Sequence, residues 1–164
     1  MIPAPTKNFD RIFDIPIEFL KENKIKLVLL DLDNTLTPWH DYVACEKTVE
    51  WVNKVKQQQI AALILTNGRG KNAQELAQKL EISVVSNAKK PFCRQIKRCL
   101  KEQNVQAAQA LIIGDQLFTD ILAANRAKTK SVLLEPISKR EWWATKVFNR
   151  TRERLVGRKI KYFE

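Results

Sequence analysis

Apolar and polar residues alternate in blocks along the chain. Five short runs are almost wholly apolar: residues 26–30, 60–65, 82–85, 110–113 and 131–134. Runs of this length are typical of parallel strands that are buried on both faces of a sheet. The segments between them have helical spacing of apolar residues or a helix-forming composition, and we expect helices over residues 46–59, 72–80, 91–103 and 119–127.

This alternation predicts a fold class. Parallel neighbours need crossover connections, and these are right-handed, so we expect an α/β, doubly wound parallel sheet of the Rossmann type with helices on both faces. A chain of 164 residues that is 45% hydrophobic suits a single domain over residues 1–164. Residues 141–160 mix aromatic and basic side chains at helical spacing and predict a basic C-terminal helix.

Composition narrows the classes of partner. The net charge is +11, and residues 126–164 hold twelve Lys or Arg against four Glu, which leaves +8 in that segment. This excess predicts anionic partners: phosphorylated substrates, an anionic membrane surface or nucleic acid. Three widely spaced cysteines and one histidine fit neither a zinc site nor a disulfide framework, so we expect any metal to be bound by oxygen.

The N-terminus and the longest apolar runs bear on location. No apolar run approaches the roughly 20 residues that a membrane-spanning helix needs. The first residues contain prolines and mixed charges but no apolar stretch of the kind found in a secretory signal. We therefore expect a cytoplasmic protein.

Polar residues follow four of the five predicted strands. In a doubly wound sheet ligands bind at the carboxyl ends of the strands, so these residues are the candidates for a functional site. A hydrophobic core has no need of them. They are Asp31, Asp33, Thr66, Asn67, Lys89, Lys90, Asp115 and Asp120.

These residue types together predict phosphoryl transfer. Asp31 and Asp115, from two different strands, can share Mg²⁺, which prefers oxygen ligands. Lys90 and the Thr66 hydroxyl can bind phosphoryl oxygens, because phosphoryl transfer depends chiefly on positioning and charge neutralisation. Asp31 can then attack phosphorus to give an aspartyl-phosphate, while Asp33 protonates the leaving oxygen and later activates water.

The same segments resemble the four motifs of the haloacid dehalogenase (HAD) superfamily, in order. The Asp-x-Asp-x-Thr signature appears as residues 31–35, the Thr after the second strand is Thr66, the lysine stands in Lys90-Pro91, and Gly114-Asp115 is followed by Asp120. Residues 114–126 resemble the YqeG-type subgroup of subclass IIIA, which is similar to mitochondrial phosphatidylglycerophosphate phosphatases. Gly68 departs from this subgroup, in which we expect Asn.

The resemblance implies roles for the acidic residues. Asp31 would be the nucleophile and a metal ligand, and Asp33 the general acid and base with its backbone carbonyl on Mg²⁺. Asp115 would be a further metal ligand. Asp120 would orient the lysine or a metal-bound water, acting through a neighbour.

It also implies the residues that hold phosphate. Thr66 and Lys90 would bind its oxygens, and Asn67 would help through its backbone N–H. Lys89 stands next to Lys90 and remains an alternative for the lysine.

The predicted linkers bear on the substrate. Residues 37–45 and 67–80 leave room for only a loop and one helix, so we expect an enzyme without a cap domain and with an open active site. An open site suits a phosphate on a large carrier, and the leading hypothesis is a phosphatidylglycerophosphate phosphatase at the membrane surface. Phosphoprotein, nucleic-acid or soluble phosphates, or a nucleic-acid-binding protein on this scaffold, are the alternatives. The basic C-terminal helix could dock on the sheet, contact anionic lipid, or do both.

Overall fold

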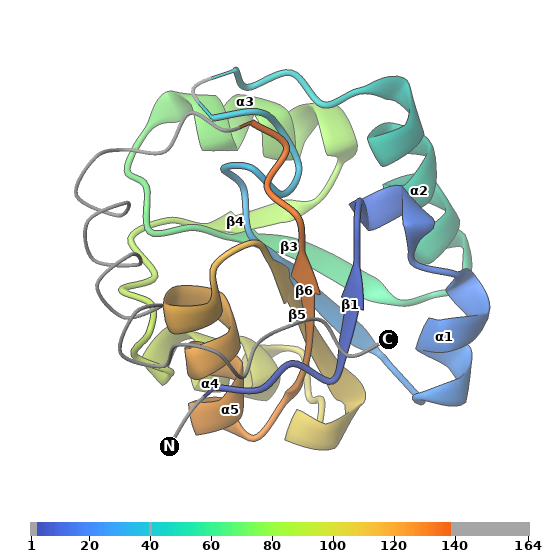
Figure 1. Ribbon diagram of the computed structural model, residues 1–164, viewed down its shortest axis with the longest axis vertical. Helices are drawn as coiled ribbons and strands as arrows, with labels where there is room; N and C mark the ends of the chain where they lie inside the picture. Colours follow the sequence, from blue (N-terminus) through green and yellow to red (C-terminus); the bar gives the residue numbers. More distant parts are fainter. Residues whose placement is uncertain (1–2, 40, 139–164) are drawn as a thin grey trace, which may run out of the picture.

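The computed structural model describes residues 3–39 and 41–138 (Figure 1). Along the chain these residues form β1 (Lys7–Phe9), a 3-10 helix η1 (Ile12–Asp14), α1 (Ile17–Glu22), β2 (Leu27–Leu30), α2 (Glu46–Gln57), β3 (Ala61–Leu65), α3 (Lys71–Leu80), β4 (Ser83–Val85), α4 (Arg94–Glu102), a 3-10 helix η2 (Ala107–Gln109), β5 (Ala110–Gly114), a π-helical turn η3 (Leu117–Ile121), α5 (Leu122–Ala127) and β6 (Lys130–Leu134).

The strands form one parallel sheet in the order β1-β6-β5-β2-β3-β4. Strand β2 lies between β3 and β5, with Leu29 opposite Leu63 on one side and Ile112 on the other. The strand order therefore reverses at β2, and the crevice at this switch point is where open α/β sheets bind ligands. The predicted doubly wound α/β fold is confirmed.

Helices cover both faces of the sheet, with α1 and α2 on one side and α4 and α5 on the other (Figure 1). Successive side chains of a strand point to opposite faces, so Val28 and Leu30 pack against α2 and α3, whereas Leu27 and Leu29 pack against α4 and α5. All four residues of β2 are fully buried. Burial on both faces explains why this strand is a continuous apolar run.

Three elements at the N-terminus, β1, η1 and α1, were not predicted. Strand β1 lies at the edge of the sheet and exposes Lys7 and Asn8, so it has no apolar run. It is held by backbone pairing to β6, with Lys7 opposite Val132, and by the bond from Thr6 N–H to Ser131 O at 2.8 Å. Helix α1 is short, and apolar periodicity over six residues is too brief to be distinctive.

Three predicted helix boundaries were wrong by two residues or more. Helix α4 begins at Arg94, not at Pro91, because Phe92 N–H donates to Lys89 O at 2.9 Å and closes a turn over residues 89–92. Helix α2 ends at Gln57, two residues early, and Gln59 takes a left-handed φ of 59°. The last predicted helix begins two residues early, at Leu117, and its first turn is π-helical.

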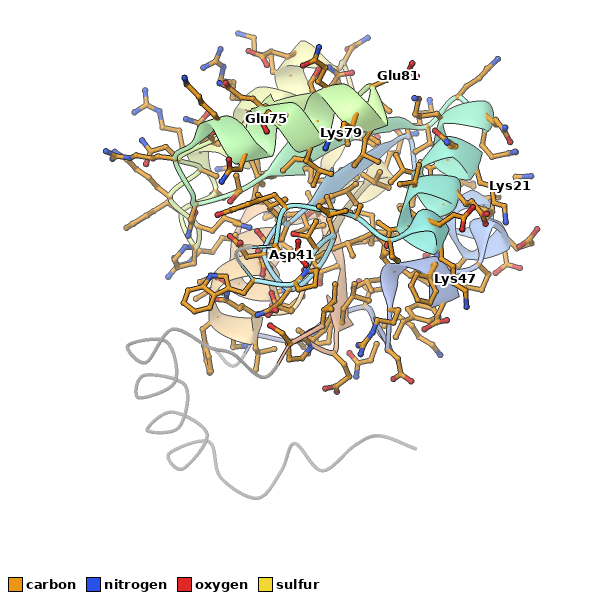
Figure 2. All side chains as sticks on the ribbon, turned by 90° about the horizontal axis from the view of Figure 1, so that it is seen from above. Lys21, Asp41, Lys47, Glu75, Lys79 and Glu81 are labelled. Carbon is orange, nitrogen blue, oxygen red and sulfur yellow. The ribbon has the colours of Figure 1, made fainter. Side chains whose placement is uncertain are left out.

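The linkers at the site are short. Figure 2 shows Asp41 on the segment between β2 and α2, with Glu75 and Lys79 on α3 in the same view. In the described parts of residues 31–45 and 66–70 there is no helix and no strand of the sheet, as expected for an enzyme without a cap domain. None of the helices in residues 3–39 and 41–138 combines the length and the apolar character that a membrane span needs. The predicted C-terminal helix, residues 141–160, lies outside the described residues.

Candidate active site

Asp31 and Asp115 leave the sheet side by side. Strands β2 and β5 are paired with Leu30 opposite Ile113, and Asp31 N–H donates to Ile113 O at 2.9 Å. Asp120, five residues after Asp115, joins them. A carboxylate oxygen from each of the three side chains lies within 4.8 Å of the other two.

Lys90 lies between two of these carboxylates. Its Nζ donates to Asp31 Oδ1 and to Asp120 Oδ1, both at 2.6 Å. The side chains are 3% exposed for Lys90 and 0% for Asp120, so this ion pair is shielded from water. Lys89 is exposed, so the structure brings Lys90 and not its neighbour to the carboxylate cluster.

The loops after β3 and β4 are joined by hydrogen bonds that hold Lys90 in place. The Asn67 side chain accepts from Lys90 N–H at 2.7 Å and donates to Lys90 O at 3.0 Å. Ala88 N–H donates to Thr66 O at 2.9 Å. Sequence reasoning expected only the backbone N–H of Asn67 to act. An amide side chain can pair with a peptide group in this way, but nothing in the sequence names the peptide that it pairs with.

Thr66 is buried, and its hydroxyl is oriented by the residue that departs from the expected motif. Gly68 N–H donates to Thr66 Oγ1 at 3.0 Å, and a hydroxyl that accepts a hydrogen bond keeps its own hydrogen to donate. A Cβ at Gly68 would lie 3.2 Å from this oxygen, which is tighter than ordinary contact. Glycine therefore lets the loop close on Thr66.

Asp120 comes from the π-helical turn η3, and turns of this kind are frequent at functional sites. Its Oδ2 accepts from Gln116 N–H at 3.1 Å, and its Oδ1 from Lys90, so both oxygens are engaged. A Cβ at Gly114 would overlap the Asp120 carboxyl group. The glycine before Asp115 thus makes room for the carboxylate that holds Lys90.

The cluster has more negative charge than Lys90 can balance. Burial, and then the charge of Asp120, raises the pKa of Asp31 to about 7 although Lys90 opposes the shift. Burial, and then the charges of Asp31 and Asp120, raises the pKa of Asp115 well above its usual value. Burial would lower the pKa of Lys90, but the charges of Asp120 and Asp31 and the hydrogen bonds to both raise it instead.

This electrostatic arrangement favours a further cation. Asp115 Oδ1 is buried and accepts no hydrogen bond from the part of the chain that the structure describes. A buried carboxylate oxygen without a donor is costly unless a cation binds it. The three-carboxylate cluster therefore has the oxygen donors and the charge that suit a divalent metal ion.

Asp33 lies in the tight loop that follows β2. Its side chain is half-buried, and the loop is closed by bonds from Leu36 N–H to Leu32 O at 3.0 Å and from Asn34 N–H to Thr37 O at 2.8 Å. Asp33 is not one of the three clustered carboxylates, in which Asp120 takes the third place. Asp33 and Asp31 flank Leu32, which is buried in the core.

Sequence reasoning missed the contact between this loop and the chain after β6. Asn34 Oδ1 accepts from Ser138 Oγ at 2.8 Å and from Ser138 N–H at 3.2 Å, and Asn34 O accepts from Ile137 N–H at 3.2 Å. Asn34 has a left-handed φ of 61°, which asparagine tolerates better than most residues. That tolerance was the one available signal, and it does not point to Ser138.

Comparison with known proteins shows the family of the chain. The sequence profile of a family described as mitochondrial PGP phosphatase matches residues 2–137. A curated relative, "Probable phosphatase YqeG" of Bacillus subtilis, is 31% identical over 157 residues, which are 96% of this chain and 91% of the relative.

Solved structures share the fold. The cobalt-bound deoxy-D-mannose-octulosonate 8-phosphate phosphatase of Haemophilus influenzae has a TM-score of 0.58 at 17% identity, over 82% of this chain and 90% of that one. The 3-deoxy-D-manno-octulosonate 8-phosphate phosphatase of Moraxella catarrhalis, solved with magnesium, phosphate and its sugar, has a TM-score of 0.51 at 16% identity over 61% and 64%. By its family match, its relative and its fold, the chain belongs to the family described as mitochondrial PGP phosphatase and is a phosphatase of the haloacid dehalogenase type.

Proposed function

We propose that the protein is a Mg²⁺-dependent phosphomonoesterase that works through an aspartyl-phosphate on Asp31. The observation that carries this proposal is Lys90, whose Nζ lies 2.6 Å from both Asp31 and Asp120 next to Asp115. Burying two carboxylates and one ammonium group, with a third carboxylate half-buried beside them, is expensive and stabilises a fold poorly. A site that binds a metal and a phosphoryl group accounts for this arrangement.

The residues present fit Mg²⁺. Asp31, Asp115 and the backbone carbonyl of Asp33 would hold it, and the buried Asp115 Oδ1 supports this assignment. Both Asp120 oxygens already accept hydrogen bonds, which favours a positioning role for Asp120 over direct metal binding. When bound, the ion supplies positive charge that neutralises the phosphoryl oxygens and lets an anionic carboxylate approach them.

The first half of the reaction uses three side chains. Asp31 attacks phosphorus, the bond from phosphorus to the leaving oxygen breaks, and Asp33 donates its proton to that oxygen. The pKa of Asp31, about 7 from burial and Asp120, falls when positive charge is added beside it, so the nucleophile is ionised at neutral pH. Lys90 donates to the phosphoryl oxygens while Asp120 holds it.

The second half returns the enzyme to its starting state. Asp33, now a carboxylate, takes a proton from water as the water oxygen attacks phosphorus, and Asp31 leaves as a carboxylate with release of inorganic phosphate. Thr66 Oγ and the backbone N–H of Asn67 donate to the phosphoryl oxygens in both halves. Gly68 N–H orients the Thr66 hydroxyl for this task.

For the substrate we propose phosphatidylglycerophosphate. The family match over residues 2–137 supports it, since that family is described as mitochondrial PGP phosphatase. The short linkers at the site and the net charge of +11 also suit a phosphate that is carried by an anionic lipid. The protein would then work peripherally at the surface of an anionic membrane.

Hydrolysis of an aryl phosphate by the purified full chain tests the chemistry. Asp31→Asn should lower kcat/KM by at least about a thousand-fold in the presence of Mg²⁺, because it removes the nucleophile. Asp41→Asn is the matched control: it removes an exposed carboxylate from the same linker and should leave kcat/KM within about two-fold of the wild type. Retained activity in Asp31→Asn, or full activity in excess EDTA, would refute the mechanism.

A substrate panel tests the lipid assignment. Phosphatidylglycerophosphate in mixed micelles is compared with a phosphopeptide, a 5′-phosphorylated oligonucleotide and a sugar phosphate at equal phosphate concentration. We expect the lipid to have the highest kcat/KM. A preference for any of the other three would overturn the substrate proposal and leave the chemistry standing.

A further inference from the structure

Exposed apolar side chains lie near the carboxyl ends of the strands, on the side of the sheet that carries the active site. Among residues 3–39 and 41–138, the exposed large hydrophobic residues are Val43, at 64% exposure, and Phe92, at 68%. Val43 is in the loop that follows β2, and Phe92 is in the loop that follows β4. Because all six strands are parallel, both loops lie at the carboxyl ends of the strands, on the side where Asp31 follows β2.

The loops after β3 and β4 add positive charge near the carboxyl ends of the strands. Residues 66–71 and 86–94 contain no Asp or Glu but five Lys or Arg: Arg69, Lys71, Lys89, Lys90 and Arg94. Lys90 is buried against its two carboxylates, whereas the other four are exposed. The charge outside the site is therefore free to attract an anion.

Hydrogen bonds hold together the segments that carry these residues. Asn87 N–H donates to Gly68 O at 3.0 Å, next to Arg69, and links the two loops. Phe92 N–H donates to Lys89 O at 2.9 Å, and Arg126 Nη1 donates to Pro91 O at 3.1 Å. We define the basic rim as Arg69, Lys89, Phe92, Arg94 and Arg126.

We propose that the basic rim docks the enzyme on an anionic lipid surface, with Phe92 in the headgroup layer and the four cations at lipid phosphates. This inference rests on the proposed lipid substrate and names the surface that presents it to Asp31. Aromatic side chains favour the membrane interface, and each cation near anionic lipid adds to binding. The rim adjoins the active site, since Lys89 and Phe92 flank Lys90 and Pro91.

The composition of the rim favours lipid over nucleic acid. One exposed phenylalanine among four cations suits a lipid surface, where a single aromatic side chain enters the headgroup layer. Proteins that bind single-stranded nucleic acid instead present several aromatic side chains on which successive bases stack. In water, an exposed Phe92 at 68% has an unfavourable apolar surface that the lipid interface would cover.

Flotation of the full chain with vesicles tests the proposal. The vesicles are phosphatidylcholine with or without phosphatidylglycerol, and since neither carries a phosphomonoester, binding is measured independently of hydrolysis. Arg69→Gln/Arg94→Gln should lower partitioning to the anionic vesicles about 25-fold, at roughly five-fold per cation. Phe92→Ser should lower partitioning on the order of ten-fold. This loss should depend less on salt concentration than the loss caused by the arginine substitutions.

The control removes the same charge from the opposite side of the molecule, at the amino ends of the strands. Lys21, labelled in Figure 2, is in the last turn of α1, and Lys101 is in the last turn of α4. Both are exposed, and Lys21→Gln/Lys101→Gln should partition within about two-fold of the wild type, as surface substitutions away from a binding face do.

Three results would overturn the proposal. The rim variants could partition like the wild type, or the control could lose as much binding as the rim variants. Alternatively, the rim variants could weaken binding to a single-stranded oligonucleotide and leave vesicle binding unchanged. Loss of vesicle binding only in the rim variants would support it, even if the aryl phosphate assay failed and the proposed chemistry had to be abandoned.

Discussion

Asp120→Asn is the substitution that best distinguishes the positioning of Lys90 from direct metal binding. The carboxylate is 0% exposed, and its two oxygens accept from Lys90 Nζ at 2.6 Å and from Gln116 N–H at 3.1 Å. An amide has only one acceptor oxygen, so its NH₂ group must face either the ammonium group or the N–H. One hydrogen bond is lost in either orientation.

The size of the effect follows from the bond that is lost. A hydrogen bond to a charged group contributes about 1.5–3 kcal/mol, and about 1.4 kcal/mol is a tenfold change in rate. If this free energy holds Lys90 in the geometry that binds the phosphoryl group, kcat/KM should fall about 10–100-fold. Removal of the Asp120 charge should also lower the pKa of Asp31 and shift the acidic limb of the pH profile to lower pH.

The assay measures kcat/KM for an aryl phosphate against pH and against Mg²⁺ concentration. Thr119→Val is the matched control, because Thr119 Oγ1 lies 3.4 Å from Asp120 Oδ2 and its loss leaves the carboxylate in place. We expect the control within about three-fold of the wild type, since 3.4 Å is long for a hydrogen bond from a hydroxyl and the bonds from Lys90 and Gln116 to the carboxylate remain. Activity of Asp120→Asn equal to the wild type, or full rescue by high Mg²⁺, would refute the positioning role.

Three further predictions concern folding and the catalytic loop. Gly114→Ala places a Cβ that overlaps Asp120 and should lower the free energy of unfolding, measured by urea denaturation, by about 1–3 kcal/mol. Gly70→Ala, with no atom within 4 Å of its Cβ, should change this free energy by less than about 0.5 kcal/mol. Ser138→Ala loses the bond to Asn34 and should lower thermal stability by about 1 kcal/mol together with kcat; an unchanged kcat would mean that the contact is only structural. In EDTA, the free energy of unfolding should fall as pH rises from about 4 to about 7. The reason is that Asp31 in the folded protein keeps its proton up to its raised pKa of about 7, whereas Asp31 in the unfolded chain loses it near 3.8. A flat pH profile contradicts this, and Asp31→Asn should flatten the profile.

The central strands could be predicted from the sequence because they are buried on both faces. The run Leu27–Leu30 is wholly apolar for that reason, and the polar residue that follows it marks the end of the strand. Strand β1 could not be predicted, since only its backbone pairs with β6 while Lys7 and Asn8 stay exposed. Burial leaves a signal in the sequence, and backbone pairing at an edge does not.

The start of α4 shows a similar limit. Proline is favoured in the first turn of a helix, so Pro91 indicated a start there. In the structure the bond from Phe92 N–H to Lys89 O closes a turn first, and the helix begins at Arg94. A proline fits both arrangements, and in the structure this loop is held by Asn67 from the loop after β3, a contact that local sequence does not indicate.

The sequence was enough to predict the five apolar strands, the residues at their carboxyl ends and the chemistry that Asp31, Thr66 and Asp115 could share. Each of these depends on local pattern: an apolar run, its end and the residue type that follows. The tertiary structure alone decided that Lys90 and not Lys89 reaches Asp31, and that Asn67 and Asp120 hold it there. These contacts join segments from different strands, and the strand order that brings them together is set by packing of the whole sheet.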